Sequence, residues 1–279
     1  MTSNKNKTIR NIIIFTLLVT GLAWLGPVLG GDPTEPGLGF LVWGTAPAVS
    51  ALIVKFVLRD KTSLGFRPHF RGNGRYYLLS LLLYPVSILI VLSLGLLLGA
   101  SSLGVITLPA LFTTMAPLAV TFFIFALFEE TGWRGYLAPS VYSLNDRLLG
   151  HAVVGIIWAS WHFPYLHELL AHTAEGLLTV LPRFLLGAMV TAVVYGEIRI
   201  RTGSVWPAVL MHWTGNTLAN TLLATFAGAG FVTLLPEKAW LGSFGMEGVL
   251  MILIFGLVGG YLYMKRRRQN RQQAPELEG

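Results

Sequence analysis

The chain has 279 residues, of which 54% are hydrophobic and only 12% are charged. Soluble domains carry about 25% charged residues, so this composition excludes an ordinary soluble domain and indicates a polytopic membrane protein. No cysteine is present, which excludes thiol nucleophiles, thiolate metal sites and disulfides. The formal net charge of +7 would suit a nucleic-acid partner, but the distribution of that charge along the chain argues against one.

Apolar segments of membrane-spanning length follow one another along the chain, and they predict an all-α bundle of about eight transmembrane helices. The first has basic residues ahead of it, as a signal peptide does, but it lacks a clear small-residue cleavage site and we interpret it as a span. We expect one integral membrane domain over residues 1–279, a motif-bearing core at about 108–227 and a polar basic tail at 265–279. The predicted spans are Ile12–Leu29, Leu38–Leu58, Tyr76–Leu98, Leu108–Phe128, Leu149–Tyr165, Leu177–Tyr195, Val205–Ala227 and Gly248–Met264.

Basic residues gather on one side of this predicted bundle. Eight crossings place both termini on the same side of the membrane, and seventeen of the twenty lysines and arginines fall there. The positive-inside rule therefore predicts that both termini are cytoplasmic. We expect a multi-pass protein of the cell membrane. The excess positive charge then faces anionic lipid, which we expect as a partner, rather than nucleic acid.

The stretch Phe128–Tyr136 closes the fourth apolar run with two adjacent carboxylates and an arginine. Charges at membrane depth cost several kcal/mol each, so their presence calls for a function. On a helix Glu130 and Arg134 are four residues apart and stack on one face, with the acid N-terminal to the base. Glu129 is turned about 100° away from Glu130. We therefore predict that Glu130 is a paired, structural carboxylate and that Glu129 is the chemically active one.

Two later spans carry histidines at helical spacing from other polar or aromatic groups. Trp158 and His162 are four apart on the fifth span, which places an aromatic ring beside the imidazole. His212 and Asn216 are four apart on the seventh span, and Asn220 follows one turn later as a weaker candidate.

The three helices bring these groups to compatible depths. At 1.5 Å per residue, Glu129, His162 and His212 lie about 14, 18 and 8 Å from the cytoplasmic ends of their helices. A desolvated glutamate can act as a general base near neutral pH, and a second imidazole with an amide can stabilise an oxyanion. The set therefore predicts a water-activating site.

Each group has a structural alternative when it is taken alone. A single histidine or asparagine in a span is commonly a hydrogen-bonding contact between helices. Only their joint occurrence at similar depth favours catalysis. Other hydrolase chemistries lack their motifs, because the chain has no cysteine, no HExxH and no GxSxG around a serine.

At these residues the chain resembles the family of CAAX prenyl endopeptidases and bacteriocin-processing enzymes, the CPBP or "abortive infection" intramembrane proteases. The resemblance covers about Phe128–Asn216 and rests on three motifs in order, EExxxR, aromatic-xxxH and HxxxN, on three separate spans. The run from Arg199 to Ala208 also resembles the family's approach to its last motif. Trp158 departs from the more usual phenylalanine but keeps an aromatic ring at that position.

The resemblance implies a role for each residue. Glu129 would activate water beside His162, His212 and Asn216 would stabilise the oxyanion, and Glu130, Arg134 and Trp158 would support the site. The family is often described as metalloproteases, and a set of Glu129, His162 and His212 can ligate Zn²⁺ with one position open for water. We favour metal-free chemistry, because no obvious carboxylates orient two zinc-bound histidines.

Two other functions stay open at the level of sequence. A proton-coupled transporter would use intramembrane glutamate and histidine as a relay, although no inverted repeat or paired broken helices are evident. A non-catalytic membrane immunity or scaffold protein would keep its phenotype when the motifs are removed. The leading interpretation is an intramembrane endopeptidase that cleaves membrane-associated or prenylated peptides near the cytoplasmic face.

Overall fold

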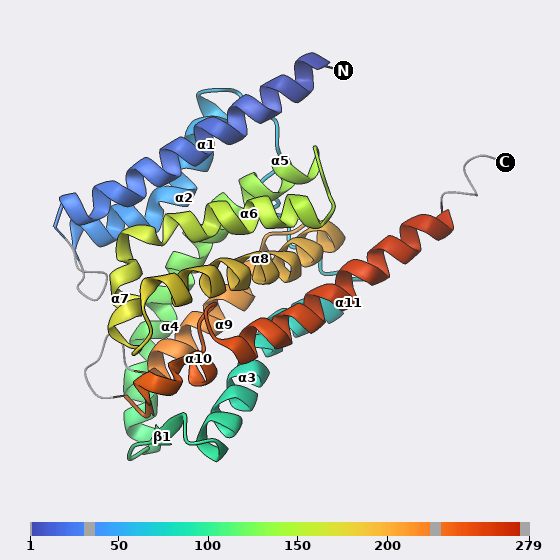
Figure 1. The fold of residues 1–279 in the computed structure, drawn as a ribbon. Helices are drawn as coiled ribbons and strands as arrows, with labels where there is room; N and C mark the ends of the chain where they lie inside the picture. Colours follow the sequence, from blue (N-terminus) through green and yellow to red (C-terminus); the bar gives the residue numbers. More distant parts are fainter. Residues whose placement is uncertain (1, 31–36, 224–229, 274–279) are drawn as a thin grey trace.

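The computed structural model describes residues 2–30, 37–223 and 230–273, and it shows a bundle of helices packed side by side (Figure 1). The prediction of an all-α polytopic protein is confirmed. Three expected features lie outside the described residues: most of the Gly30–Gly37 turn with Asp32 and Glu35, the last residues of the seventh span (224–227), and the tail from 274 onward.

The elements follow one another along the chain almost entirely as helices, with one two-stranded ribbon. Residues Thr131–Leu137 form a π-helical segment, and Phe163–Tyr165 and Pro236–Lys238 form 3₁₀ turns. The remaining elements are α1 (Thr2–Val28), α2 (Leu38–Phe56), α3 (Gly74–Leu97), β1 (Ser101–Leu103), α4 (Leu108–Glu130), α5 (Ala138–Tyr142), α6 (Leu148–Trp161), α7 (Leu166–Ala171), α8 (Leu177–Thr202), α9 (Trp206–Leu223), β2 (Val232–Leu234), α10 (Ala239–Gly242) and α11 (Val249–Gln273).

Six helices among the described residues are long and apolar enough to cross a membrane, so the protein is a multi-pass membrane protein. The other two predicted spans correspond to α6 and α9. Helix α6 has 14 residues and is about 21 Å long, short of the roughly 30 Å hydrocarbon core. It ends at Trp161 rather than at the predicted Tyr165 because Pro164 disfavours helix in the residue before it. These two helices carry the candidate histidines, His162 at the end of α6 and His212 on α9.

Packing brings the motif-bearing helices together in the middle of the bundle. Helix α4 packs against α9 and α2, α6 packs against α8, and α8 packs against α11. The largest fully buried side chains of the described part include Trp133, Trp161 and Tyr195, which come from the π-helical segment, α6 and α8. The core therefore sits at the level of the candidate site.

A short antiparallel ribbon forms between two segments that lie outside the predicted spans. Ser101 pairs with Leu234 and Leu103 with Val232. The first strand precedes α4 and the second follows α9, so the ribbon joins the two helices at the end of the bundle far from the termini (Figure 1).

At the opposite end, buried charges attach α11 to the bundle. Glu197 on α8 accepts from Arg266 Nη2 at 2.9 Å and faces His151 Nε2 at 3.1 Å, and it also pairs with Arg201. Helix α11 thus continues through residues 265–273, and the buried Arg266 is unavailable to lipid, although the sequence placed it in a basic tail. Both ends of the described chain lie at this end of the bundle (Figure 1).

Candidate active site

The acidic pair lies where α4 changes its hydrogen-bond pattern. Glu129 and Glu130 are the last residues of α4, and the next seven residues are π-helical, with Ala138 N–H donating to the carbonyl of Trp133. Single π-helical turns inside helices are frequent at functional sites. A glycine is required here, because a Cβ on Gly132 would lie 2.4 Å from Cβ of Pro47 on α2. The sequence Thr-Gly-Trp-Arg-Gly therefore lets α2 approach the helix directly after the carboxylates.

Glu130 and Arg134 form the ion pair that their spacing predicted. Arg134 Nη1 donates to Glu130 Oε1 at 2.9 Å, and both side chains are fully buried. The guanidinium lies between two aromatic rings, with its central carbon 4.2 Å from the ring centroid of Trp158 and 4.0 Å from that of Tyr195. Nε and Nη2 of Arg134 have no hydrogen-bond partner among the described residues. The rings therefore help to hold a charge that one carboxylate only partly satisfies.

His212 on α9 connects both carboxylates of α4. Its Nδ1 lies 2.8 Å from Glu130 Oε1, and its Nε2 lies 3.7 Å from Glu129 Oε1. Because the Glu130 carboxylate accepts from Nδ1–H, the ring is held with Nε2 toward Glu129. All three side chains are buried. Glu130, predicted only to pair with Arg134, thus also orients His212, and Glu129 also accepts from Trp133 Nε1 at 3.4 Å.

His162 lies at the end of α6, and its ring is close to Trp158. Its Nδ1 lies 3.0 Å from the carbonyl of Trp158, which leaves Nε2 for other partners. The Trp158 ring centroid is 6.1 Å from that of His162 and 6.3 Å from that of His212, so the indole contacts both imidazoles. The ring of His162 also packs edge-on against Phe184. The structure therefore joins Glu129, Glu130 and His212 by short contacts, and it brings His162 to the same site through Trp158.

The two asparagines extend the site along α9. Asn216 is half-buried one helical turn beyond His212. Asn220 donates from Nδ2 to the main-chain carbonyl of Asn216 at 2.8 Å. Asn220 therefore forms a hydrogen bond within its own helix. The spacing of four residues places Asn216 on the helix face that carries His212.

Sequence reasoning missed one arginine that holds the site. Arg199 on α8 donates from Nε to the main-chain carbonyl of Arg134 at 2.8 Å and from Nη2 to that of Ser63 at 3.2 Å. It thereby fixes the π-helical segment against α8 and the loop after α2. The signal was present, because Arg199 opens the run that resembles the family's last motif, but nothing in the sequence pointed to its partner.

Zinc held by Glu129, His162 and His212 is the alternative that the resemblance implied. Among the described residues, no group of three or more His, Asp and Glu side chains is placed to hold a metal ion. Nδ1 of His212 faces Glu130 and Nδ1 of His162 faces a carbonyl, so Nε2 is the ring nitrogen that each histidine leaves available. One orienting carboxylate therefore exists for His212, which the sequence did not show. Zinc binding by these three residues stays a prediction.

Comparison with known proteins bears on this same part of the chain. Residues 109–218 match the family model described as type II CAAX prenyl endopeptidase Rce1-like. The predicted resemblance is confirmed. The match runs from the start of α4 into α9 and includes every candidate site residue, Asn220 aside.

A curated relative agrees with the family match. "CAAX prenyl protease 2" from Methanococcus maripaludis is 38% identical over 52 residues. The aligned stretch covers 19% of this chain and 19% of that protein, so the likeness to this relative concerns about a fifth of each. What this protein acts on is therefore a proposal drawn from its site.

Proposed function

We propose that this protein is an intramembrane endopeptidase in which Glu129 and His212 activate a water molecule for attack on a peptide bond. The observation that supports the proposal most directly is the approach of Glu129 Oε1 to His212 Nε2, 3.7 Å apart and buried, from two different helices. A water about 2.8 Å from both atoms would complete a triangle and hydrogen-bond to each. The Rce1-like match over the same residues supports the same reaction class.

The surrounding contacts suggest a division of labour. Glu129 would take a proton from the water as general base. The Glu130 carboxylate holds His212 by Nδ1, so Nε2–H of a protonated His212 would face the reacting atoms and donate to the developing oxyanion. Asn216, one turn along α9, would supply a second donor from its amide. Trp158 and the Glu130–Arg134 pair would keep these groups in place.

His162 has a supporting part in this scheme. Its ring lies beside that of Trp158, with 6.1 Å between the ring centroids. From there it would orient the water or the substrate through Nε2, because Nδ1 is engaged by the carbonyl of Trp158. We therefore expect its loss to be less severe than the loss of Glu129 or His212.

The substrate is proposed as a membrane-associated or prenylated peptide, and the site as one in the cell membrane. The relative's printed name refers to a CAAX prenyl protease, which supports prenylated peptides as one substrate class. The basic residues near the termini support contact with anionic lipid headgroups. No step is routed through zinc, because no group of three ligating side chains is placed to hold an ion among the described residues.

The experiment is cleavage of a quenched fluorogenic peptide library by the purified protein in lipid nanodiscs, with cleavage sites read by mass spectrometry. Glu129→Ala and His212→Ala are expected to lower kcat/KM by roughly 10³-fold and His162→Ala by roughly 10²-fold. His167→Ala removes a histidine that is exposed outside the site and is the matched control. Cleavage retained by Glu129→Ala would remove the proposal.

A second readout separates this function from proton-coupled transport. The same variants are reconstituted into proteoliposomes under a pH gradient. The proposal expects no flux that depends on Glu129. Flux lost in Glu129→Ala, together with a library left uncleaved by the wild type, would assign the site to transport instead.

A further inference from the structure

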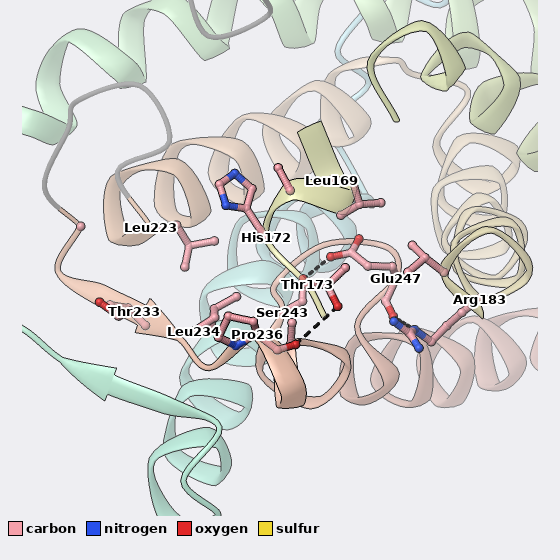
Figure 2. A pocket seen from close by; sticks show the side chains of 15 residues that line it. Leu169, His172, Thr173, Arg183, Leu223, Thr233, Leu234, Pro236, Ser243 and Glu247 are labelled. Carbon is pink, nitrogen blue, oxygen red and sulfur yellow. Dashed lines mark hydrogen bonds between the residues drawn. The ribbon is translucent and has the colours of Figure 1, made fainter. Parts of the chain in front are cut away.

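A cavity of about 530 Å³ lies at the end of the bundle opposite the termini. It is enclosed by α7, the first turns of α8, the end of α9, β2 and α10, and it has both apolar and charged walls. Figure 2 shows His172, Ser243 and Glu247 among the side chains around it. Its volume falls in the range of ligand-binding pockets in proteins. None of the candidate catalytic side chains lines it.

The cavity continues the line of the candidate site along α9. His212, Asn216, Asn220 and Leu223 are spaced four, four and three residues apart, so they share one face of the helix. Leu223 lines the cavity and lies about 10 Å beyond Asn216 along the axis. That length corresponds to about three residues of an extended peptide.

Side-chain contacts also connect the cavity to His162 at the end of α6. The ring of His162 packs against Phe184 at a centroid distance of 5.5 Å. Leu169, which lines the cavity, packs in the same apolar cluster as Phe184. Phe184 therefore contacts His162 and belongs to the apolar cluster against which a residue of the cavity wall packs.

The residues around the candidate site differ in exposure. Every residue of 131–138, directly after the acidic pair, is buried. Arg199, Glu197 and His151 are buried as well. By contrast His162, Asn216 and Asn220 are half-exposed. The exposed part of the site therefore includes the stretch of α9 that leads to the cavity.

The charges around the cavity favour a cation. Arg183 donates to both carboxylate oxygens of Glu175, and its Nε donates to the main-chain carbonyl of Glu247 at 2.6 Å. The buried carboxylate of Glu247 accepts from the hydroxyl of Ser243 and forms no ion pair with any described residue. Arg183 is thus paired with Glu175, and the Glu247 carboxylate in the cavity wall has no ion-pair partner among the described residues.

We propose that this cavity binds the part of the peptide substrate adjacent to the scissile bond and that Glu247 selects a lysine or arginine there. The inference rests on the proposed endopeptidase function and names the kind of peptide that the site accepts. A basic side chain in the cavity would pair with the Glu247 carboxylate, while its methylene groups would lie on Leu169, Leu223 and the other apolar walls.

The test uses the full-length protein in nanodiscs and one peptide cleaved in the library assay. Arginine and leucine are exchanged at each of the four positions on either side of the cleaved bond. The wild type is expected to prefer arginine at one of these positions by roughly tenfold in kcat/KM. Glu247→Gln is expected to remove that preference through KM and to leave the leucine peptide unaffected. Glu237→Gln, an exposed glutamate outside the cavity lining, is the matched control.

A second variant covers loss of folding in Glu247→Gln. Ala171 is exposed and lines the cavity, so Ala171→Trp should fold and raise KM for both peptides several-fold. The inference is overturned if the wild type shows no arginine preference, if Glu247→Gln keeps it, or if Ala171→Trp leaves KM unchanged.

The outcome is separable from that of the proposed function. If the wild type cleaves no peptide more than Glu129→Ala does, binding of fluorescein-labelled hexa-arginine and hexa-leucine peptides to the wild type is measured by anisotropy. Tighter binding of the arginine peptide that is lost in Glu247→Gln supports the cavity even then. Equal binding of the two peptides rejects it.

Discussion

Replacing Glu130 by alanine tests whether this carboxylate holds the site together. In the folded protein Glu130 is fully buried and contacts Arg134 at 2.9 Å and His212 at 2.8 Å. Its removal leaves the Arg134 guanidinium buried with two aromatic rings and no carboxylate partner. Breaking a buried pair in this way costs about 3–5 kcal/mol. For a chain of this size that corresponds to a fall of roughly 10 °C in the unfolding midpoint.

The assay is thermal unfolding of purified variants in one detergent, followed by tryptophan fluorescence. Glu237→Ala removes an exposed glutamate and should leave the midpoint unchanged. Glu130→Ala combined with Arg134→Met removes the stranded charge as well, so more than half of the lost stability should return. Peptide cleavage should not return, because His212 still lacks the acceptor for Nδ1.

Two results would refute this reasoning. A midpoint of Glu130→Ala within about 2 °C of the wild type would show that the pair contributes little to stability. A double variant as unstable as the sum of the two single variants would show that Glu130 and Arg134 are not coupled.

Two further predictions concern packing and pH. Gly132→Ala places Cβ 2.4 Å from Cβ of Pro47, and this overpacking should lower the unfolding free energy by about 1–3 kcal/mol. Gly74→Ala, with open space around its Cβ, is the control and should leave stability unchanged. Equal unfolding midpoints for the two variants would contradict the close approach of Gly132 to Pro47. Burial raises the pKa of Asp60, but hydrogen bonds from Asn11, Thr62 and Tyr136 outweigh it and lower that pKa below 3.8. The stability that Asp60 contributes is therefore present above about pH 4 and is lost as pH falls through the lowered pKa. The midpoint difference between wild type and Asp60→Asn should be constant near neutral pH and shrink below about pH 4, and a difference that grows on acidification would exclude this origin.

The local contacts of the site could be predicted from sequence because they depend on spacing along one helix. Glu130 and Arg134 pair as an i, i+4 couple, even though the chain between them turns π-helical. The Trp158 ring does lie beside His162, although at 6.1 Å between ring centroids.

Contacts between helices could not be predicted in the same way. The bond from His212 to Glu130 joins residues 82 positions apart and depends on how α4 and α9 rotate about their axes. Hydropathy fixes the length of a helix but not this rotation. For the same reason the sequence could place His162 at a suitable depth and could not show that the Trp158 ring lies near both His162 and His212.

Short elements were missed for a different reason. Three-residue strands such as Ser101–Leu103 carry almost no periodic signal, and their pairing with Val232–Leu234 comes from distant parts of the chain.

The count of spans was affected by helix length. Helix α6 keeps the apolar composition of a span but stops at Trp161, before the proline that follows.

The ribbon of β1 and β2 has a mechanical consequence for the site. β1 ends five residues before α4, and β2 follows α9. The ribbon therefore links α4, which carries Glu129, to α9, which carries His212, at a point away from the contact between these two side chains. A binder raised against these two strands would change the distance between Glu129 and His212 without entering the lipid. A water-soluble antibody fragment that binds the ribbon would therefore inhibit the site allosterically, which a hydrophobic small molecule would have to do from within the membrane.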